Sequence, residues 1–190
     1  MIRIATAADA PAIADIFNEN IEERGFANGA LIRDSPEERA RSLAGSDARH
    51  PTFVHVDASG DILGWCALKP LSTRPSWLDV AEVALYVKRS SRNRVVGAQL
   101  LVRLLDAARA REFKSLIALV LAKNEASQRG LGFAGFVEMA RVRDAAFLHG
   151  HWVDMMWLQK DLDCEEEPSI ALYAARFRIE AVDPEATAVR

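Results

Sequence analysis

The 190-residue chain has little of several features that mark particular classes of protein. Its two cysteines, Cys66 and Cys164, form no CxxC pair and imply no disulfide framework. Four histidines without clustered cysteines argue against a structural zinc site, and we expect no metal. The 24 basic residues are fewer than the 27 acidic ones, and the net charge of −3 argues against electrostatic capture of nucleic acid.

Long apolar runs are also missing. The longest, such as residues 116–122, have the length of a strand and fall far short of a membrane span. Met1 leads directly into Ile2-Arg3-Ile4 without the apolar stretch of a signal peptide, which predicts a cytoplasmic location without a membrane partner.

The chain has enough hydrophobic residues to form one core, because 50% of the residues are hydrophobic and 27% are charged. The length suits a single α/β or α+β domain. We expect this domain to cover residues 1–162. We interpret residues 163–190, which begin with a polar, acidic stretch, as a C-terminal extension of unknown role.

Hydrophobic periodicity predicts an alternation of strands and helices. Strands are expected at residues 2–6, 52–56, 62–68, 80–87, 115–122, 136–143 and 152–162, and helices at 8–23, 36–43 and 96–110. Residues 124–133 are ambiguous, because a polar start is followed by Gly130 and Gly132. A helix there is expected to be short or frayed.

The central unit is a strand, a basic loop at residues 88–95 and the helix that begins at Val96. A helix N-terminus presents unpaired N–H groups and positive potential. Together with Gly97 and the arginines of the loop, it makes a pyrophosphate site plausible. A solvated loop with a fortuitous run of charge is the alternative.

The segment Arg92-Asn93-Arg94-Val95-Val96-Gly97-Ala98 resembles the R/Q-x-x-G-x-G/A coenzyme A motif of the GNAT N-acetyltransferases. Four further stretches occur in the matching order: Ile2-Arg3-Ile4-Ala5 with Asp9, Ala81-Glu82 with Leu85-Tyr86-Val87, Asn124-Glu125-Ala126-Ser127 with Ala134-Gly135-Phe136, and Phe147-Leu148-His149-Gly150 with Trp152 and Asp154. The chain is similar in particular to the phosphinothricin and methionine sulfone group, which acetylates free amino acids and their analogues.

This resemblance implies the GNAT fold, an α+β fold of three layers. Helices would flank a mixed sheet of about seven strands, in which the central parallel strands at 80–87 and 115–122 splay apart. It also implies acetyl-CoA as co-substrate, a small-molecule amine as acceptor and a homodimer. The residues expected to bind acetyl-CoA are Leu85, Tyr86 and Val87 through their backbone, residues 92–98 at the pyrophosphate, and Asn124 and Ser127 through hydrogen bonds. Capping of a helix is the alternative role for Asn124 and Ser127.

Glu82 occupies the position of the family's catalytic acid, and we expect it to accept the proton of the attacking amine. A strand glutamate on the solvent face is the alternative. His149 is a candidate for a second acid/base group, with a plain turn histidine as the alternative.

The resemblance places substrate contacts at Arg74, Glu82, Val83 and Ala84, with Arg74 as the cation for a substrate carboxylate. Phe26, Trp77 and Trp152 are candidates for the wall of an apolar pocket, or else for the core.

Two positions depart from the family pattern. Val95 replaces the first glycine of the coenzyme A motif, and Leu131 stands where many relatives have a tyrosine that protonates the leaving thiolate.

An acetyl-CoA-dependent N-acetyltransferase acting on a small amine is the main hypothesis. A degenerate acyl-CoA-binding protein with little or no turnover is the alternative, and acetylation of a protein or peptide is a third possibility on the same fold.

Overall fold

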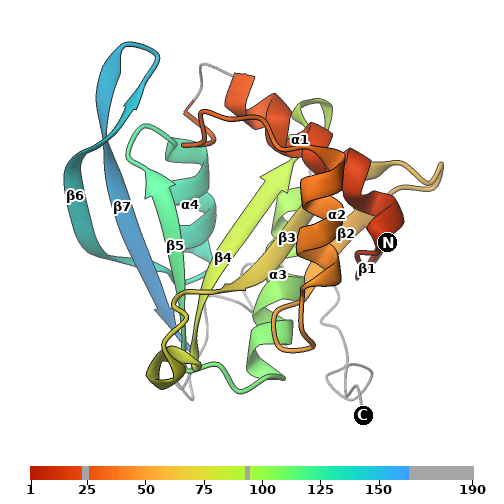
Figure 1. Cartoon of the computed structure of the whole chain (residues 1–190). Coiled ribbons are helices and arrows are strands. Elements are labelled where there is room, and N and C mark those ends of the chain that lie inside the picture. The colour runs from red at the N-terminus through yellow and green to blue at the C-terminus, as the bar shows by residue number, and fades with distance from the viewer. Residues whose placement is uncertain (23–25, 93–94, 163–190) are drawn as a thin grey trace.

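The computed structural model describes residues 1–22, 26–92 and 95–162, which form one sheet with helices on both faces (Figure 1). The strands are β1 (Ile2–Ile4), β2 (Thr52–Val56), β3 (Ile62–Pro70), β4 (Val80–Val87), β5 (Ser115–Leu121), β6 (Val137–Leu148) and β7 (His151–Asp161). The helices are α1 (Ala10–Glu22), α2 (Pro36–Ala44), α3 (Val96–Arg109) and α4 (Glu125–Phe133), with short 3₁₀ turns η1 (Ala7–Asp9), η2 (Pro75–Trp77) and η3 (Arg89–Ser91).

The seven strands lie in the order β1-β2-β3-β4-β5-β7-β6. All neighbours are antiparallel except β4 and β5, which run parallel at the centre. One core cluster packs α3 against the sheet, and a second packs α1 and Leu43 of α2 against the opposite face. The expected fold, α+β with a mixed sheet of seven strands between helices, is confirmed.

Local signals explain most element boundaries. Ser35 caps α2, since its hydroxyl accepts the Glu38 N–H at 3.1 Å and Pro36 fills the first helical position. Asn124 caps α4 by accepting the Ser127 N–H at 3.2 Å. The ambiguous glycine-rich segment is therefore a short helix of nine residues.

Two expected boundaries were wrong. The strand expected at 136–143 begins at Val137 and continues to Leu148, and its register with β7 shifts between Glu138 and Ala140 and again between Val142 and Ala146. Such shifts interrupt the alternation of side chains on which the sequence prediction relied. The first helix begins at Ala10, after a 3₁₀ turn in which the Asp9 carboxylate accepts the Thr6 N–H at 2.7 Å.

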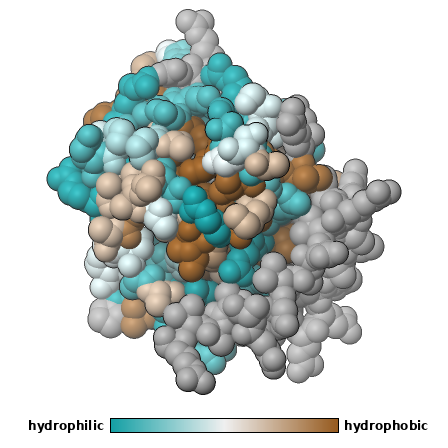
Figure 2. Space-filling model, turned by 90° about the vertical axis from the view of Figure 1, so that its right-hand side faces the viewer, coloured by the Kyte–Doolittle hydropathy of each residue, from teal (hydrophilic) through white to brown (hydrophobic). Residues whose placement is uncertain are grey.

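Figure 2 shows the side on which β1 and α2 lie, where hydrophilic side chains predominate around a middle region that is more hydrophobic. No residue of α2 is fully buried, which agrees with a helix lying at the surface. In the part of the chain that the structure describes, no helix is long and apolar enough to cross a membrane.

Candidate active site

The two central strands separate part of the way along their length. β4 and β5 pair over only three positions, Val80 with Ser115, Ala81 with Leu116 and Glu82 with Ile117. Beyond Glu82, residues 83–87 stay paired with β3, but their other edge has no strand partner within the described residues. The expected splay is therefore present, and Glu82 stands where it begins.

α3 begins just beyond the open end of β4. Among the described residues, its first backbone bond runs from the Gln99 N–H to the Val95 carbonyl at 2.9 Å. The amides of residues 96–98 thus form the N-terminal turn of the helix, where positive potential is concentrated. Val95 has a φ of −68° and is 40% exposed, so it occupies an ordinary helical conformation that needs no glycine. Asn93 and Arg94 lie outside the described residues.

The small residue at position 97 keeps the space beside β4 open. A Cβ added to Gly97 would lie 3.5 Å from Cγ2 of Val87, which is ordinary van der Waals contact. The protein itself would accept an alanine there. The missing side chain thus leaves room between the end of β4 and the first amides of α3.

The loop between β4 and α3 is held by α1. The Arg89 N–H donates to the Glu19 carboxylate at 3.0 Å, and the Arg92 guanidinium donates to the Asn20 side chain at 2.9 Å. Asn20 is buried and in turn donates to the Ile16 carbonyl at 2.7 Å. Arg92 thus helps to hold the loop against α1, and its expected role at the pyrophosphate stays a prediction.

The face of β4 that carries Glu82 lies under α1 and α2 for only part of its length. Across the β3–β4 ladder, Tyr86 pairs with Trp65, Ala84 with Ala67 and Glu82 with Lys69. The first two pairs belong to the core cluster beneath α1 and α2. The third is more open, since the Glu82 side chain is 29% exposed and that of Lys69 is 45% exposed. Glu82 is thus reachable from solvent at the start of the splay.

Lys69 is the charged neighbour of Glu82, and the sequence alone did not single it out. Its Nζ lies 4.0 Å from Oε1 of Glu82. Tyr86 lies further along the same face, where burial first and then the negative charge of Glu82 raise its pKa to about 12. The phenol is therefore neutral at physiological pH.

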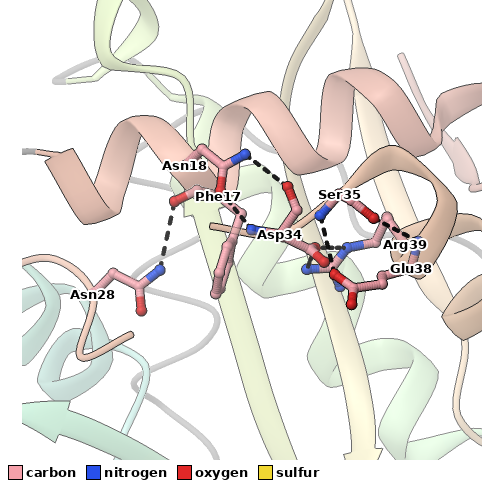
Figure 3. Close-up of polar contacts among 7 residues, drawn as sticks. All are labelled: Phe17, Asn18, Asn28, Asp34, Ser35, Glu38 and Arg39. Atoms are coloured by element: carbon pink, nitrogen blue, oxygen red, sulfur yellow. Dashed lines mark hydrogen bonds and ion pairs between the residues drawn. The ribbon is translucent and has the colours of Figure 1, made fainter. Parts of the chain in front are cut away.

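A polar network fixes the chain between α1 and α2 over this face (Figure 3). The Asn18 side chain donates to the Asp34 carbonyl at 2.9 Å and accepts the Asp34 N–H at 2.8 Å. Asp34 also pairs with Arg39, whose guanidinium lies 5.4 Å from the centre of the Phe17 ring and 4.9 Å from that of Trp65. These contacts hold α1 and α2 against the face of β3 and β4 on which the Glu82 side chain lies.

The structure does not bring every predicted substrate contact to Glu82. Val83 and Ala84 follow Glu82 on β4, with Val83 facing the α3 side and Ala84 the α1 side. Arg74 lies exposed in the loop between β3 and β4, where its backbone N–H donates to the Ser72 hydroxyl at 3.2 Å. Its role toward a substrate carboxylate stays a prediction.

His149 lies elsewhere, at the tip of the β6–β7 hairpin. His149 and Gly150 have φ values of 52° and 81°, as in a two-residue type I′ turn. With Phe26, Lys123 and His151, His149 lines a cavity of about 430 Å³ beyond the end of β5. Lys123 is six residues past Ile117, the partner of Glu82, or about 20 Å along an extended strand. His149 therefore stays a prediction as an acid/base group.

Of the remaining candidate residues, some lie at the surface and others pack in the core or cap a helix. For Trp77 and Trp152 the alternative of a core position is wrong, because they are 44% and 61% exposed, and their part in a pocket wall stays a prediction. Leu131 packs against the α3 core and supplies no proton. Asn124 acts as the helix cap, as one alternative had it. In the described ranges, no three His, Cys, Asp or Glu side chains are placed to share a metal ion.

Comparison with known proteins agrees with this geometry. Residues 2–157 match the model of the acetyltransferase (GNAT) domain. The L-methionine sulfoximine/L-methionine sulfone acetyltransferase of Pseudomonas paraeruginosa is 30% identical over 85% of this chain and 94% of its own length. The phosphinothricin N-acetyltransferase of Streptomyces viridochromogenes is 29% identical over 88% of this chain and 90% of its own length.

A solved structure with the same fold is the GNAT phosphinothricin acetyltransferase of Sinorhizobium meliloti, determined in complex with acetyl-CoA. It superposes with a TM-score of 0.80 at 24% identity and covers 91% of this chain and 97% of that one. With the family model matching nearly the whole described chain, the protein belongs to the GNAT family of acetyltransferases.

Proposed function

We propose that this acetyltransferase transfers the acetyl group of acetyl-CoA to the primary amine of an amino acid or an analogue of the methionine sulfone and phosphinothricin type. The observation that carries the proposal is the edge of β4 beyond Glu82, which has no strand partner within the described residues and leads to the N-terminus of α3.

The residues at this opening suit acetyl-CoA. An extended chain of amides can pair with an unpartnered strand edge, so the backbone of Leu85, Tyr86 and Val87 would hold the pantetheine arm. The amides of residues 96–98 and the positive end of α3 would hold the diphosphate. Gly97 leaves room for it. When bound, acetyl-CoA supplies an activated acyl carbon.

The role of Glu82 follows from the acceptor's charge. The pKa of an α-amine is about 8, so most of the amine is protonated at neutral pH and cannot attack. The Glu82 carboxylate takes up this proton, directly or through water, at the solvent-reachable start of the splay. No acid is needed at Leu131, because a thiol with a pKa of about 8.5 leaves readily as the thiolate.

The test is turnover with acetyl-CoA and a panel of amino acids and analogues, following the release of free thiol. Cys66 is fully buried and burial raises the pKa of its thiol, so it adds little background. Cys164→Ser removes the other thiol of the chain. Tight acetyl-CoA binding without thiol release on any amine would favour a binding protein without turnover.

We also propose that the enzyme is a homodimer. β6 is an edge strand that is exposed along most of its length and carries exposed apolar residues, among them Val137, Met139 and Val142. Exposed apolar edges of this kind mark interaction surfaces. Light scattering that reports a particle of twice 21.0 kDa would support the dimer, and a monomer at working concentration would exclude it.

Dependence on acetyl-CoA favours a cytoplasmic location, which cell fractionation tests. We further propose that residues 1–162 contain the complete catalytic unit, because every site residue considered above lies within them. Removal of residues 163–190 is then expected to leave turnover unchanged, and loss of turnover from a folded truncated protein would show otherwise.

A further inference from the structure

We propose that Lys69 binds the carboxylate of the acceptor, so that Lys69 and Glu82 together select an α-amino acid over a simple amine. This inference rests on the proposed function and adds a residue that determines its substrate specificity.

The register of the sheet fixes the two side chains beside each other. Lys69 and Glu82 are directly opposite on antiparallel strands, so their side chains leave the same face of the sheet. The neighbouring pair on that face, Ala67 and Ala84, is buried beneath the helices. The charged pair is therefore the first row that a ligand can reach from solvent.

Among residues 1–22, 26–92 and 95–162, no hydrogen bond engages either charged group. The distance of 4.0 Å between Nζ of Lys69 and Oε1 of Glu82 exceeds hydrogen-bond length. Within the described residues, the structure gives the Lys69 ammonium no other partner. Three donors on one side and a carboxylate on the other are thus free to engage a ligand.

An α-amino acid carries the matching pair of charges on one carbon. With its ammonium toward Glu82, where the proton is taken up, its carboxylate comes to lie toward Lys69. The two ion pairs then run antiparallel, so that each charge of the ligand faces an opposite charge of the protein. A primary amine without the carboxylate makes only the first contact.

Other cations are less well placed for this task. Arg74 lies exposed in the loop after β3 and makes no contact with Glu82 in the part of the chain that is described. Lys88 follows the opposite end of β4. Lys69 is the cation whose position the strand pairing itself fixes.

The experiment compares L-methionine sulfone with its carboxamide, which keeps the amine and loses the negative charge. Lys69→Met retains the apolar stem, Lys69→Arg retains the charge, and Arg41→Gln removes a cation from an exposed position on α2 as the matched control. For the acid, Lys69→Met is expected to raise KM roughly 10- to 100-fold, as for loss of a charge-assisted hydrogen bond.

For the carboxamide, KM is expected to change less than about twofold, because Lys69 has no partner on that substrate. Lys69→Arg should retain most of the preference for the acid, and Arg41→Gln should match wild type. Equal losses on acid and amide would mean that Lys69 acts only through Glu82. Either that result or no loss on either substrate overturns the proposal.

Equilibrium binding of L-methionine sulfone by calorimetry separates this inference from the proposed function. If wild type acetylates no amine, the proposed function fails, and the Lys69 assignment still requires weaker binding in Lys69→Met than in Arg41→Gln. Absent or equal binding in these proteins would overturn the assignment as well.

Discussion

The two ends of β4 differ in a way that separates stability from binding. At its start, residues 80–82 are paired with β5, and residues 81–82 are paired with β3 on the other side as well. At its end, residues 83–87 have β3 as their only strand partner among the described residues. One strand therefore completes the sheet over part of its length and offers a free edge over the rest, and Glu82 lies at the change.

Two glycines near Val87 show a similar contrast between the side of β4 that is paired with β3 and the side that faces α3. A Cβ on Gly64, in the closed ladder, would lie 2.9 Å from the Tyr86 carbonyl oxygen and 3.3 Å from Cα of Val87. A Cβ on Gly97, on the open side, would meet only Cγ2 of Val87 at 3.5 Å. The fold thus requires the first glycine, whereas the protein itself would accept an added methyl group at the second.

The largest effect is expected at the boundary between the two ends. Glu82→Gln removes the proton acceptor and should lower kcat by roughly 10²- to 10⁴-fold, the usual contribution of general base catalysis. The dissociation constant of acetyl-CoA should change little, because the cofactor contacts lie further along β4 and on α3. Steady-state kinetics and calorimetry together measure both. An equal loss of turnover and of cofactor binding would count against this role for Glu82.

On the closed side, Gly64→Ala is expected to destabilise the protein by roughly 1–3 kcal/mol, because backbone atoms of Tyr86 and Val87 block the added methyl group. Urea unfolding of the variant and of wild type measures the difference in the free energy of unfolding. A variant as stable as wild type would show that β3 and β4 shift apart without cost.

Further from the opening, Asp9 is expected to contribute to stability alone. Hydrogen bonds from Arg3 are the main cause that lowers the pKa of Asp9 to about 2, below an unfolded value near 3.9. A lowered pKa in the folded state stabilises the protein at pH values above the pKa of the unfolded state, and this stabilisation is lost as the pH falls toward 2. Asp9→Asn should thus cost about 2 kcal/mol at pH 7, and the difference from wild type should vanish near pH 2.

Urea unfolding between pH 2 and pH 7 checks this prediction, and a difference that is constant with pH would contradict it. Binding of acetyl-CoA by Asp9→Asn, measured at pH 7 where the variant remains folded, should equal that of wild type.

The smallest effect is expected on the open side. Gly97→Ala should fold with unchanged or slightly higher stability, because alanine favours a helix over glycine. Its affinity for acetyl-CoA should fall by about tenfold, the equivalent of 1.4 kcal/mol. Thermal unfolding and calorimetry give the two quantities. Unaltered affinity would mean that the diphosphate does not approach position 97.

Much of this arrangement was predictable from the sequence, because its signals are local. The strand at Val80–Val87 and the start of the helix at Val96 follow from hydrophobic periodicity and the motif at residues 92–98. Glu82 was found because that motif placed its strand within a known family pattern. The cap role of Asn124 was also among the local possibilities.

The parts that escaped prediction depend on how distant segments meet. Lys69 is an ordinary lysine at a strand end until the register sets it opposite Glu82. The hydrogen bond from Arg92 to Asn20 joins residues 72 positions apart, so a motif arginine gave no sign of its role in holding α1. Trp77 and Trp152 are large and apolar, yet composition does not reveal which such residues stay at the surface.

The most direct measurement of the central claim is a crystal structure of the enzyme with acetyl-CoA. We expect the diphosphate at the amides of residues 96–98, the pantetheine arm along the edge of residues 83–87, and the acetyl group next to Glu82. Acetyl-CoA bound instead in the cavity lined by Phe26, Lys123 and His149, with β4 and β5 closed against each other, would contradict it.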